Sequence, residues 1–288
     1  MMNFDALFEK CSTLKVGVIG DVMLDAYMWG NTERISPEAP VPVVTVNKKE
    51  IRLGGAGNVA WNLVSMGADT FILSVVGNDT AGARLTELLK QSGIHTDYLL
   101  SSDARITTSK TRVISRNQQM MRLDEEQTGD LSQKEEDLFI AQVSSFIEKE
   151  RPDILIFEDY NKGVLTASCI ERTIALCKSA GILTAADPKR KNFFTYAGID
   201  LFKPNLKEVR DAFPSLEIKT DLQSLTNAHQ SLFQKLNHHF SLITLSEKGI
   251  FYHDAQNGEI IPSHFRNIAD VSGAGDTVIA VAAMIYRI

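Results

Sequence analysis

The chain has 288 residues, of which 44% are hydrophobic and 23% charged, as is typical of soluble globular proteins. Its formal charge of −6 at pH 7 argues against general nucleic-acid binding, which needs a basic surface. The three cysteines show no CxxC spacing, which favours reduced thiols over a disulfide framework or a zinc site. Because no apolar run is long enough to span a membrane, we expect a cytoplasmic protein with no membrane segment.

Compact apolar runs over residues 14–20 and 71–77 predict buried strands. The apolar spacing of residues 58–68 and 83–93 predicts helices. The proline-rich stretch 31–42 is unsuited to a helix, and the residues just after it alternate as in a strand. A second strand-like stretch covers 106–123, with a turn near Asn117.

Strand and helix patterns then alternate along the chain. We expect strands over 153–159, 182–188, 200–205 and 241–249, a hairpin with its turn at 257–258, and helices over 132–149, 168–181, 206–213, beyond 221 and over 273–286. Such alternation predicts an α/β fold with a mostly parallel sheet. The stretches 31–50 and 104–123 interrupt the alternation, and we expect them to form a small accessory sheet.

The sequence DVSGAGDTV, residues 270–278, places two glycines directly before a helix and an acid in its first turn. The free N–H groups of Gly273, Ala274, Gly275 and Asp276, together with the helix dipole, would form an anion site. A carboxylate beside a phosphoryl group can accept a proton from an attacking hydroxyl. Asp276 could equally be a helix cap, and the spacing leaves both interpretations open.

In KPNLKE, residues 203–208, Asn205 and Glu208 stand three positions apart where a strand meets a helix. By itself this pattern favours a capping box. The alternative is that the pair faces a hydrated Mg²⁺ ion, which prefers oxygen ligands and keeps several waters.

Two more polar residues lie near strand ends or helix starts. Asn58 follows the glycines of GGAGN, and Asp25 follows the first strand, near the edge where α/β sheets place ligands. Asn58 could bind a hydroxyl or cap the helix. In isolation we favour the cap for Asn58 and a solvated turn for Asp25.

Residues 104–122 contain basic side chains and no acid, in an acidic chain. A solvated strand face is the simpler interpretation, and a phosphate-binding face is the alternative, because arginine suits bidentate phosphate contacts. Strand alternation puts four of the basic residues on one face if the turn near 117 keeps the register: Lys110, Arg112, Arg116 and Arg122. The pair His238 and His239 is expected at the surface.

The order and spacing of these motifs resemble the ribokinase-like (PfkB-type) carbohydrate kinases. The similarity covers nearly the whole chain, through GGAGN at 54–58, DP at 187–188, N-x-x-E at 205–208, TLSEKG at 244–249 and GAGD at 273–276. It implies a three-layer α/β fold with a mostly parallel central sheet and a small β lid, and ATP-dependent sugar phosphorylation with Mg²⁺.

Four further segments look more narrowly like the D-glycero-β-D-manno-heptose-7-phosphate kinases. They are RISPEAPVPVV at 34–44, SRNQQMMRLD at 115–124, DYNKG at 159–163 and DPK at 187–189. Those enzymes phosphorylate O1 of the heptose 7-phosphate on the route to ADP-heptose and the lipopolysaccharide core. Many are fused to a nucleotidyltransferase domain, whose HxGH signature is absent here. We therefore expect one kinase domain over 1–288 that lacks its last C-terminal part, since relatives continue beyond the GAGD helix.

The resemblance also assigns roles to residues. Asp276 would be the catalytic base, and the amides of Gly273, Ala274 and Gly275 the anion hole. Asn205 and Glu208 would organise Mg²⁺, meeting it through water, together with the ATP phosphates. The nucleotide would be bordered by Thr244, Ser246 and Gly249.

The remaining assignments concern the substrate. The sugar hydroxyls would contact Asp25, Gly55 and Asn58. We expect the substrate phosphate to be bound by the lid through Lys110, Arg112 and Arg116, with Lys189 of DPK reaching in from the main sheet. Asp159 of DYNKG is a further substrate-binding candidate. Since lid strands in relatives often pair between subunits, the resemblance also implies a homodimer.

Two other functions stay open. One is a ribokinase-like kinase for an unphosphorylated sugar or a nucleoside. The basic lid stretch argues against it, because an uncharged sugar has no phosphate for these side chains to bind. The other is a catalytically inactive sugar-binding protein on the same fold, because fold does not fix function.

Overall fold

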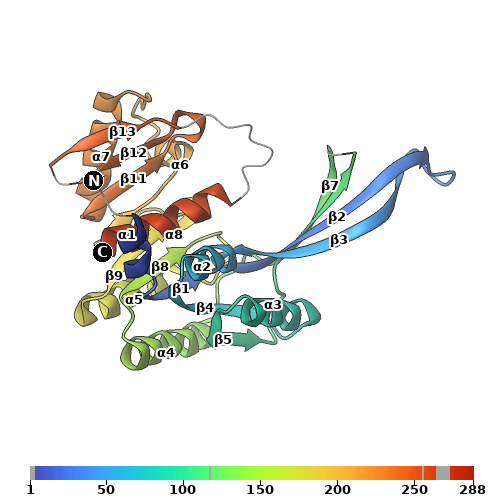
Figure 1. Ribbon diagram of the computed structural model, residues 1–288, viewed down its shortest axis with the longest axis horizontal. Coiled ribbons are helices and arrows are strands. Elements are labelled where there is room, and N and C mark those ends of the chain that lie inside the picture. The colour runs from blue at the N-terminus through green and yellow to red at the C-terminus, as the bar shows by residue number, and fades with distance from the viewer. Residues whose placement is uncertain (1–3, 117, 255, 264–272) are drawn as a thin grey trace.

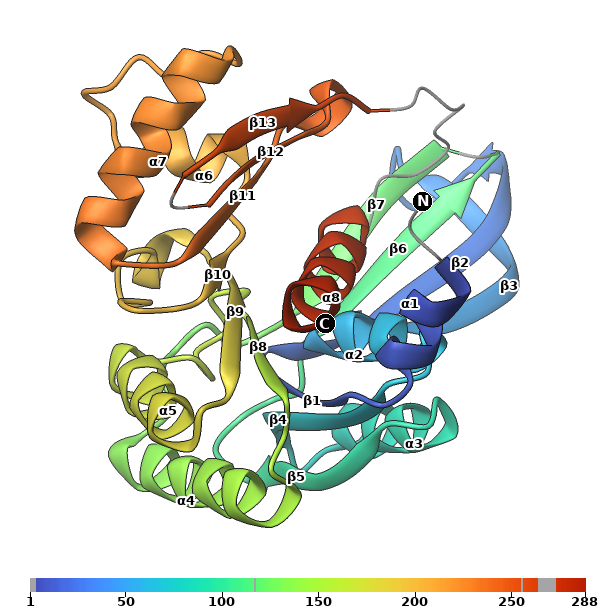
Figure 2. The same cartoon turned by 60° about the vertical axis from the view of Figure 1, so that its left-hand side comes forward.

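A nine-stranded sheet forms the centre of the protein in the computed structural model, which describes residues 4–116, 118–254, 256–263 and 273–288. The strand order is β13-β12-β11-β10-β9-β8-β1-β4-β5 (Figures 1 and 2). All pairings from β5 to β11 are parallel, and β12 and β13 add an antiparallel hairpin. The strands are β1 (Lys15–Gly20), β4 (Asp69–Gly77), β5 (His95–Ser102), β8 (Ile154–Glu158), β9 (Leu183–Asp187), β10 (Leu201–Phe202), β11 (Phe240–Thr244), β12 (Ile250–His253) and β13 (Gly258–Ile261).

Helices cover both faces of this sheet, so the predicted three-layer α/β fold is confirmed. One core cluster joins the sheet to α4 (Gln133–Glu150), α5 (Ala167–Ala180), α6 (Leu206–Ala212) and α7 (Leu222–Leu236). The other joins it to α1 (Phe4–Cys11), α2 (Ala56–Ser65), α3 (Thr80–Gln91) and α8 (Ala274–Arg287). Strands that are buried on both faces have continuous apolar sequences. For this reason β1 and β8 could be predicted from the sequence.

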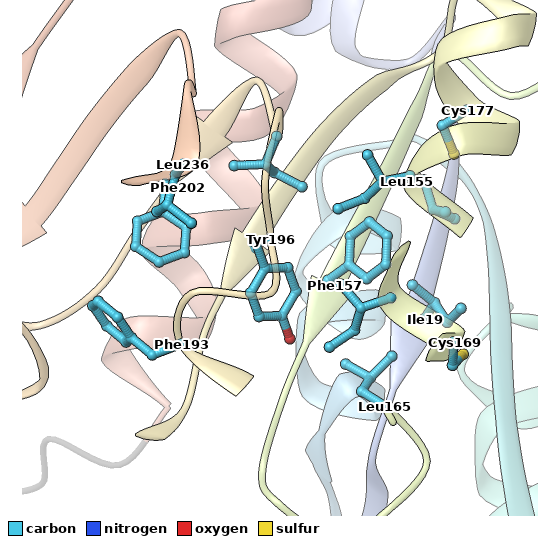
Figure 3. Packing of buried hydrophobic residues seen from close by; sticks show 14 of the residues in the cluster. Ile19, Leu155, Phe157, Leu165, Cys169, Cys177, Phe193, Tyr196, Phe202 and Leu236 are labelled. Atoms are coloured by element: carbon cyan, nitrogen blue, oxygen red, sulfur yellow. The ribbon is translucent and has the colours of Figure 1, made fainter. Parts of the chain in front are cut away.

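Figure 3 shows how aromatic rings fill the first of these clusters. The rings of Phe157 on β8 and Tyr196 meet edge to face at 5.7 Å between centroids. Phe193 and Phe202 pack in the same way at 5.2 Å. This dense packing fixes the carboxyl end of β8, and several site residues come directly after that end in the chain.

A second sheet of four strands, the lid, projects from the main body (Figure 1). Its order is β3-β2-β6-β7, with β2 (Val22–Ile35), β3 (Pro42–Gly55), β6 (Ser109–Ser115) and β7 (Gln118–Glu125). The predicted accessory sheet is thus confirmed, but its first part begins at Val22 rather than at residue 31. Asp25 and Gly30 interrupt the apolar pattern of β2, and pairing with β3 and β6 on both sides compensates for them.

Other differences from the predicted elements are local. The half-exposed strand β5 was not predicted, since its polar residues give it little apolar signal. The three cysteines are free and buried, as expected of reduced thiols. Among the described residues, no helix has the length and apolar character needed to cross a membrane.

Candidate active site

Asp276 lies in the first turn of α8 and is 5% exposed. Its Oδ2 accepts a hydrogen bond from Asn58 Nδ2 at 2.7 Å, and its Oδ1 accepts one from the Tyr160 hydroxyl at 3.1 Å. The N-cap position belongs to Gly273, which has a left-handed φ of 79°. Asp276 is therefore not the helix cap, and its carboxylate is held by side chains from two other segments.

Burial raises the pKa of Asp276, the bond from Asn58 lowers it, and the nearby carboxylate of Asp187 raises it again. The net direction is upward. A buried carboxylate whose pKa lies above its ordinary value is better suited to accept a proton than a solvated one.

Asn58 is likewise not a cap. It is the third residue of α2, whose N-cap is Gly55 with no side-chain cap bond. The positive φ of 58° at Gly55 and the close approach of the Asp21 carbonyl leave no room for a Cβ there. GGAGN thus turns the chain sharply enough to aim Asn58 at Asp276.

Tyr160 is positioned by a loop that Asp21 organises. The Asp21 carboxylate accepts the backbone N–H groups of Tyr160 at 2.9 Å, Lys162 at 3.0 Å and Val164 at 3.2 Å. Because a carboxylate that accepts several amides fixes the local backbone, the Tyr160 ring is held with its hydroxyl on Asp276.

The N-terminus of α8 has the features of an anion site. Its N-cap Gly273 has no side chain to cap it, so among the described residues its first N–H groups, including those of Gly273, Ala274 and Gly275, are available to an acceptor. A Cβ on Gly275 would lie 3.6 Å from Lys203 Nζ, so a buried ammonium group stands just beside these amides. Lys203 itself forms an ion pair with Asp187 at 2.6 Å.

Asn205 and Glu208 form the capping box at the start of α6. Asn205 Oδ1 accepts the Glu208 N–H and Glu208 Oε2 accepts the Asn205 N–H, both at 2.8 Å. The capping interpretation is confirmed. Glu208 Oε1 also forms an ion pair with Lys189 at 3.1 Å, and Lys189 lies 3.2 Å from Asp187. The box is therefore tied by Lys189 to the ion pair beside α8.

The residues assigned to the nucleotide lie next to this capping box. Thr244, at the end of β11, forms an isolated parallel bridge with Asn205. Ser246 begins a short 3₁₀ turn that Gly249 ends. The φ of 102° at Gly249, with the Ile261 carbonyl against it, admits only glycine.

A cavity of about 900 Å³ lies between the lid and the first turns of α2 and α8. It brings together the catalytic and sugar-binding candidates, because Asp25, Gly55, Asn58 and Asp276 all line it. A volume of this size is in the range of small-molecule sites. Asp25 is not a simple solvated turn residue: it lies within β2 and accepts a hydrogen bond from Tyr27 OH at 3.1 Å.

Two of the three basic lid candidates also line this cavity. Lys110 and Arg112 face it from β6, and Arg112 pairs with the Asp25 carboxylate. Arg112 is in register with Tyr27 on one side and with Arg122 on the other. Among the described residues that line the cavity, Lys110 is the basic side chain with no carboxylate in ion-pair contact, and burial followed by Lys162 lowers its pKa.

The other substrate candidates do not line the cavity. Arg116 is exposed at the β6–β7 turn with a φ of 49°. Asp159 is 1% exposed and accepts bonds from the Tyr196 hydroxyl at 3.1 Å and the Asn161 N–H at 2.7 Å. Burial, followed by the charge of Asp21, raises the pKa of Asp159 to about 6. Lys189 belongs to the ion-pair cluster beside α8.

Four residues of the site were missed in the sequence: Arg52, Tyr160, Lys203 and Glu158, whose carboxylate lies within 4.8 Å of those of Asp187 and Asp276. Arg52 lines the cavity from β3, 4.8 Å above the Tyr27 ring and 2.5 Å from Glu50. Arg52 lies opposite Asp25 in the sheet, and this neighbour can be predicted only when the pairing of β2 with β3 is known. Tyr160 and Lys203 lie inside the motifs DYNKG and KPN, in which roles were predicted for other residues only.

The cavity brings a buried carboxylate together with a helix N-terminus suited to an anion, an arrangement expected of an enzyme that transfers a phosphoryl group to a small molecule. The sequence matches the pfkB family carbohydrate kinases over residues 13–286. The chain belongs to that family of carbohydrate kinases.

Curated relatives are similar over most of this chain. It is 40% identical over 274 residues to the bifunctional protein HldE of Sulfurimonas denitrificans, covering 95% of this chain and 56% of that protein. It is 42% identical over 266 residues to the bifunctional protein HldE of Helicobacter hepaticus, covering 92% of this chain and 54% of that protein. The chain thus spans little more than half the length of these relatives.

Solved structures share the fold at low sequence identity. Phosphofructokinase-2 from Escherichia coli, in complex with fructose-6-phosphate, has a TM-score of 0.76 at 17% identity, over 95% of this chain and 87% of that one. Arabidopsis thaliana ribokinase complexed with ribose and ATP has a TM-score of 0.71 at 17% identity, over 95% and 86%. At this identity the likeness establishes the ribokinase-like fold.

Proposed function

We propose that this protein transfers the γ-phosphoryl group of ATP to O1 of D-glycero-β-D-manno-heptose 7-phosphate, giving the 1,7-bisphosphate for ADP-heptose and lipopolysaccharide-core synthesis. We further propose that residues 1–288 act as one kinase domain. The observation that carries the proposal is the shared cavity: the buried Asp276 carboxylate and the basic lid side chains Lys110 and Arg112 line the same space. Asp276 suits deprotonation of a hydroxyl, and the basic lid side chains suit a phosphate.

In this mechanism Asp276 accepts the proton of the anomeric hydroxyl as that oxygen attacks phosphorus. Asn58 and Tyr160 hold the two carboxylate oxygens, so the basic lone pair has a fixed direction before the sugar arrives. The N–H groups at the start of α8, with Lys203 beside them, stabilise negative charge on the transferring group. Deprotonation and charge stabilisation thus come from adjacent residues of one helix turn.

ATP and Mg²⁺ would bind near the Asn205–Glu208 capping box at the start of α6. When bound, Mg²⁺ neutralises charge on the nucleotide phosphates. Both oxygens of Glu208 are already engaged, by the Asn205 N–H and by Lys189, which supports contact through water rather than direct coordination. Thr244, Ser246 and Gly249 would border the nucleotide, since Thr244 bridges to Asn205.

The lid would recognise the 7-phosphate. Among the described residues, no carboxylate pairs with Lys110, whereas Arg112 is held by Asp25 and Arg52 by Glu50. A phosphate that enters the cavity would therefore contact Lys110 first. It would then replace the carboxylate partner of Arg112 or Arg52. Asp25, when released, could accept hydrogen bonds from sugar hydroxyls.

A phosphotransfer assay tests the proposal. The protein is given ATP and Mg²⁺ with heptose 7-phosphate, and in parallel with the unphosphorylated heptose, fructose and ribose. We expect turnover with the heptose phosphate to exceed that with every neutral sugar. Equal turnover of a neutral sugar would favour a neutral-sugar kinase, and sugar binding without any turnover would favour a binding protein.

A further inference from the structure

The two arginines of the lid that line the cavity are paired with carboxylates of the lid itself. Arg112 on β6 pairs with Asp25 on β2, and Arg52 pairs with Glu50 two positions before it on β3. All four residues line the cavity. Both guanidinium groups therefore hold an anion before any ligand enters.

Tyr27 brings the two ion pairs together. It lies on β2, the strand between β3 and β6, and it is 6% exposed. The Cζ atom of Arg52 lies 4.8 Å from the centre of its ring, and that of Arg112 lies 5.3 Å from it. Because a phosphate offers three acceptor oxygens and arginine suits phosphate geometry, one phosphate beside this ring could bind both guanidinium groups.

Glu50 has a second cationic partner that it would keep if Arg52 were taken from it. Its Oε2 lies 2.9 Å from Lys48 Nζ, and Lys48 does not line the cavity. The bonds from Lys48 and then Arg52 lower the pKa of Glu50, so this carboxylate is anionic at neutral pH. Loss of Arg52 to another anion would therefore leave no unpaired charge on Glu50.

We propose that Glu50 is a displaceable internal anion, which occupies Arg52 in the free protein and releases it to the phosphate dianion of a ligand. The inference rests on the proposed function only in taking that ligand to be the sugar phosphate. An entering anion gains Arg52 only if it binds this arginine better than Glu50 does. A phosphate that also contacts Arg112 and Lys110 meets this condition, whereas a lone carboxylate would only replace one carboxylate by another. Glu50 thus determines which anions the lid accepts.

The test is a gain of affinity for inorganic phosphate. Phosphate is titrated into the nucleotide-free protein at neutral pH and constant ionic strength, and the Nε–Hε signal of Arg112 is followed by NMR. This signal reports on the lid and not on the anion site at the start of α8. Glu50→Gln keeps the side-chain shape and should bind phosphate about two- to fivefold more tightly than the wild type, as expected when a partly exposed competing ion pair is removed.

Two controls separate this competition from a general change of charge. Asp124→Asn removes the same charge from another ion pair of the lid, in which Asp124 lies 2.7 Å from Arg122. Neither of these residues lines the cavity, so this variant should bind phosphate as the wild type does. In an Arg52→Gln background, Glu50→Gln should bring no further gain, because the two changes act on one contact.

Three results would overturn the proposal. If neither the wild type nor Glu50→Gln binds phosphate at millimolar concentration, the lid holds no phosphate site. If Glu50→Gln binds phosphate no more tightly than the wild type, Glu50 does not compete for Arg52. If the gain persists without Arg52, or Asp124→Asn gains as much, the effect is general electrostatics. Failure of the proposed function is a separate result, since it would appear as equal turnover of phosphorylated and neutral sugars by the wild type.

Discussion

Asp276 is held at both oxygens, so its amide variant separates chemistry from structure. Asp276→Asn keeps the size of the side chain but cannot accept the hydroxyl proton. We expect phosphoryl transfer to fall by about 10²–10⁴-fold, while sugar binding measured by calorimetry stays close to that of the wild type. A variant with most of the wild-type rate would show that Asp276 is not the base.

Tyr160→Phe tests the second hydrogen bond to the same carboxylate. The Tyr160 hydroxyl lowers the pKa of Asp276, so its removal should raise that pKa. Asp276 must be ionised to accept a proton, so the acid limb of the kcat/KM profile should move to higher pH. The measurement is a pH profile of both proteins, and an unchanged acid limb would contradict the assigned role of Tyr160.

The residues around Asp276 show how far the sequence alone could reach. GAGD and GGAGN indicated Asp276 and Asn58, because glycines directly before a helix allow the backbone to approach a ligand or a neighbouring segment closely. Glu158, Tyr160 and Lys203 were not indicated, since each lies at or just after the end of a strand and has no distinctive local pattern. Only the registers of β8 with β9 and of β9 with β10 bring them to one place, and neither register can be predicted from local patterns.

At the scale of elements, the lid separates two arginines that looked equivalent in the sequence. Arg112→Ala should weaken binding of the sugar phosphate by about 10- to 100-fold, as expected for the loss of a charge-assisted contact. Arg116→Ala is the matched control and should have little effect, because Arg116 lies outside the cavity. Affinities for heptose 7-phosphate and for the unphosphorylated sugar provide the measurement.

A larger loss of sugar-phosphate affinity in Arg116→Ala than in Arg112→Ala would contradict this placement of the phosphate. Loss of affinity for both sugars alike in Arg112→Ala would indicate that Arg112 acts by positioning Asp25. The sequence-based expectation of one basic face is correct for Lys110, Arg112 and Arg122, since Arg112 and Arg122 are paired in register. It is wrong for Arg116, because the pairing shifts between Val113 and Ile114 and Arg116 takes a left-handed turn conformation. Irregularities of this kind leave no trace in residue alternation.

A histidine cluster where α7 meets β11 and β12 should make the protein sensitive to acid. His229 Nδ1 and His238 Nε2 both contact Ser241 Oγ, at 2.8 and 2.6 Å. Burial lowers the pKa of His229 to about 4 and that of His238 to about 3. In the unfolded chain both titrate near roughly 6.5, so their stabilising effect is complete above that pH and is lost as the pH falls toward 4.

Urea unfolding measured between pH 7 and pH 5 checks this expectation. Over that interval each histidine should cost up to about 1.4 kcal/mol of unfolding free energy per pH unit. His238→Gln should reduce the pH slope, and His239→Gln, whose side chain is largely exposed, should not. Equal slopes for wild type and His238→Gln would show that the cluster is not responsible.

His238 also corrects an expectation, because it was placed at the surface and is fully buried. Helix α7 ends at Leu236, and Asn237 takes a left-handed conformation. That one residue turns the following histidine inward, while His239 stays outside. A polar stretch near a helix end cannot by itself reveal such a reversal.

For the whole molecule, the lid predicts a homodimer. Met120, Met121 and Leu123 on β7 are 43–53% exposed, and open sheet edges and apolar strands of this kind usually need covering. We expect light scattering at micromolar protein to give the mass of two chains, and Met121→Glu with Leu123→Glu to shift it toward one. A wild type that stays monomeric would contradict pairing through the lid.

The overall architecture could be predicted because strand and helix patterns alternate over most of the chain. The order of strands in the sheet could not, since β1 pairs with β4 on one side and with the much later β8 on the other. The cavity depends on the same long-range arrangement, which places the lid over the first turn of the last helix.

The central position of β1 has a consequence for the order of folding. Its pairing with β4, and that of β4 with β5, joins segments close in the chain, whereas its pairing with β8 closes a much longer loop at a higher entropic cost. We therefore expect the amides of β4 to gain hydrogen-exchange protection before those of β8 when refolding is followed by pulse labelling. Until β8 arrives, one side of β1 is an unpaired apolar edge, and newly made chains should aggregate most readily during that interval.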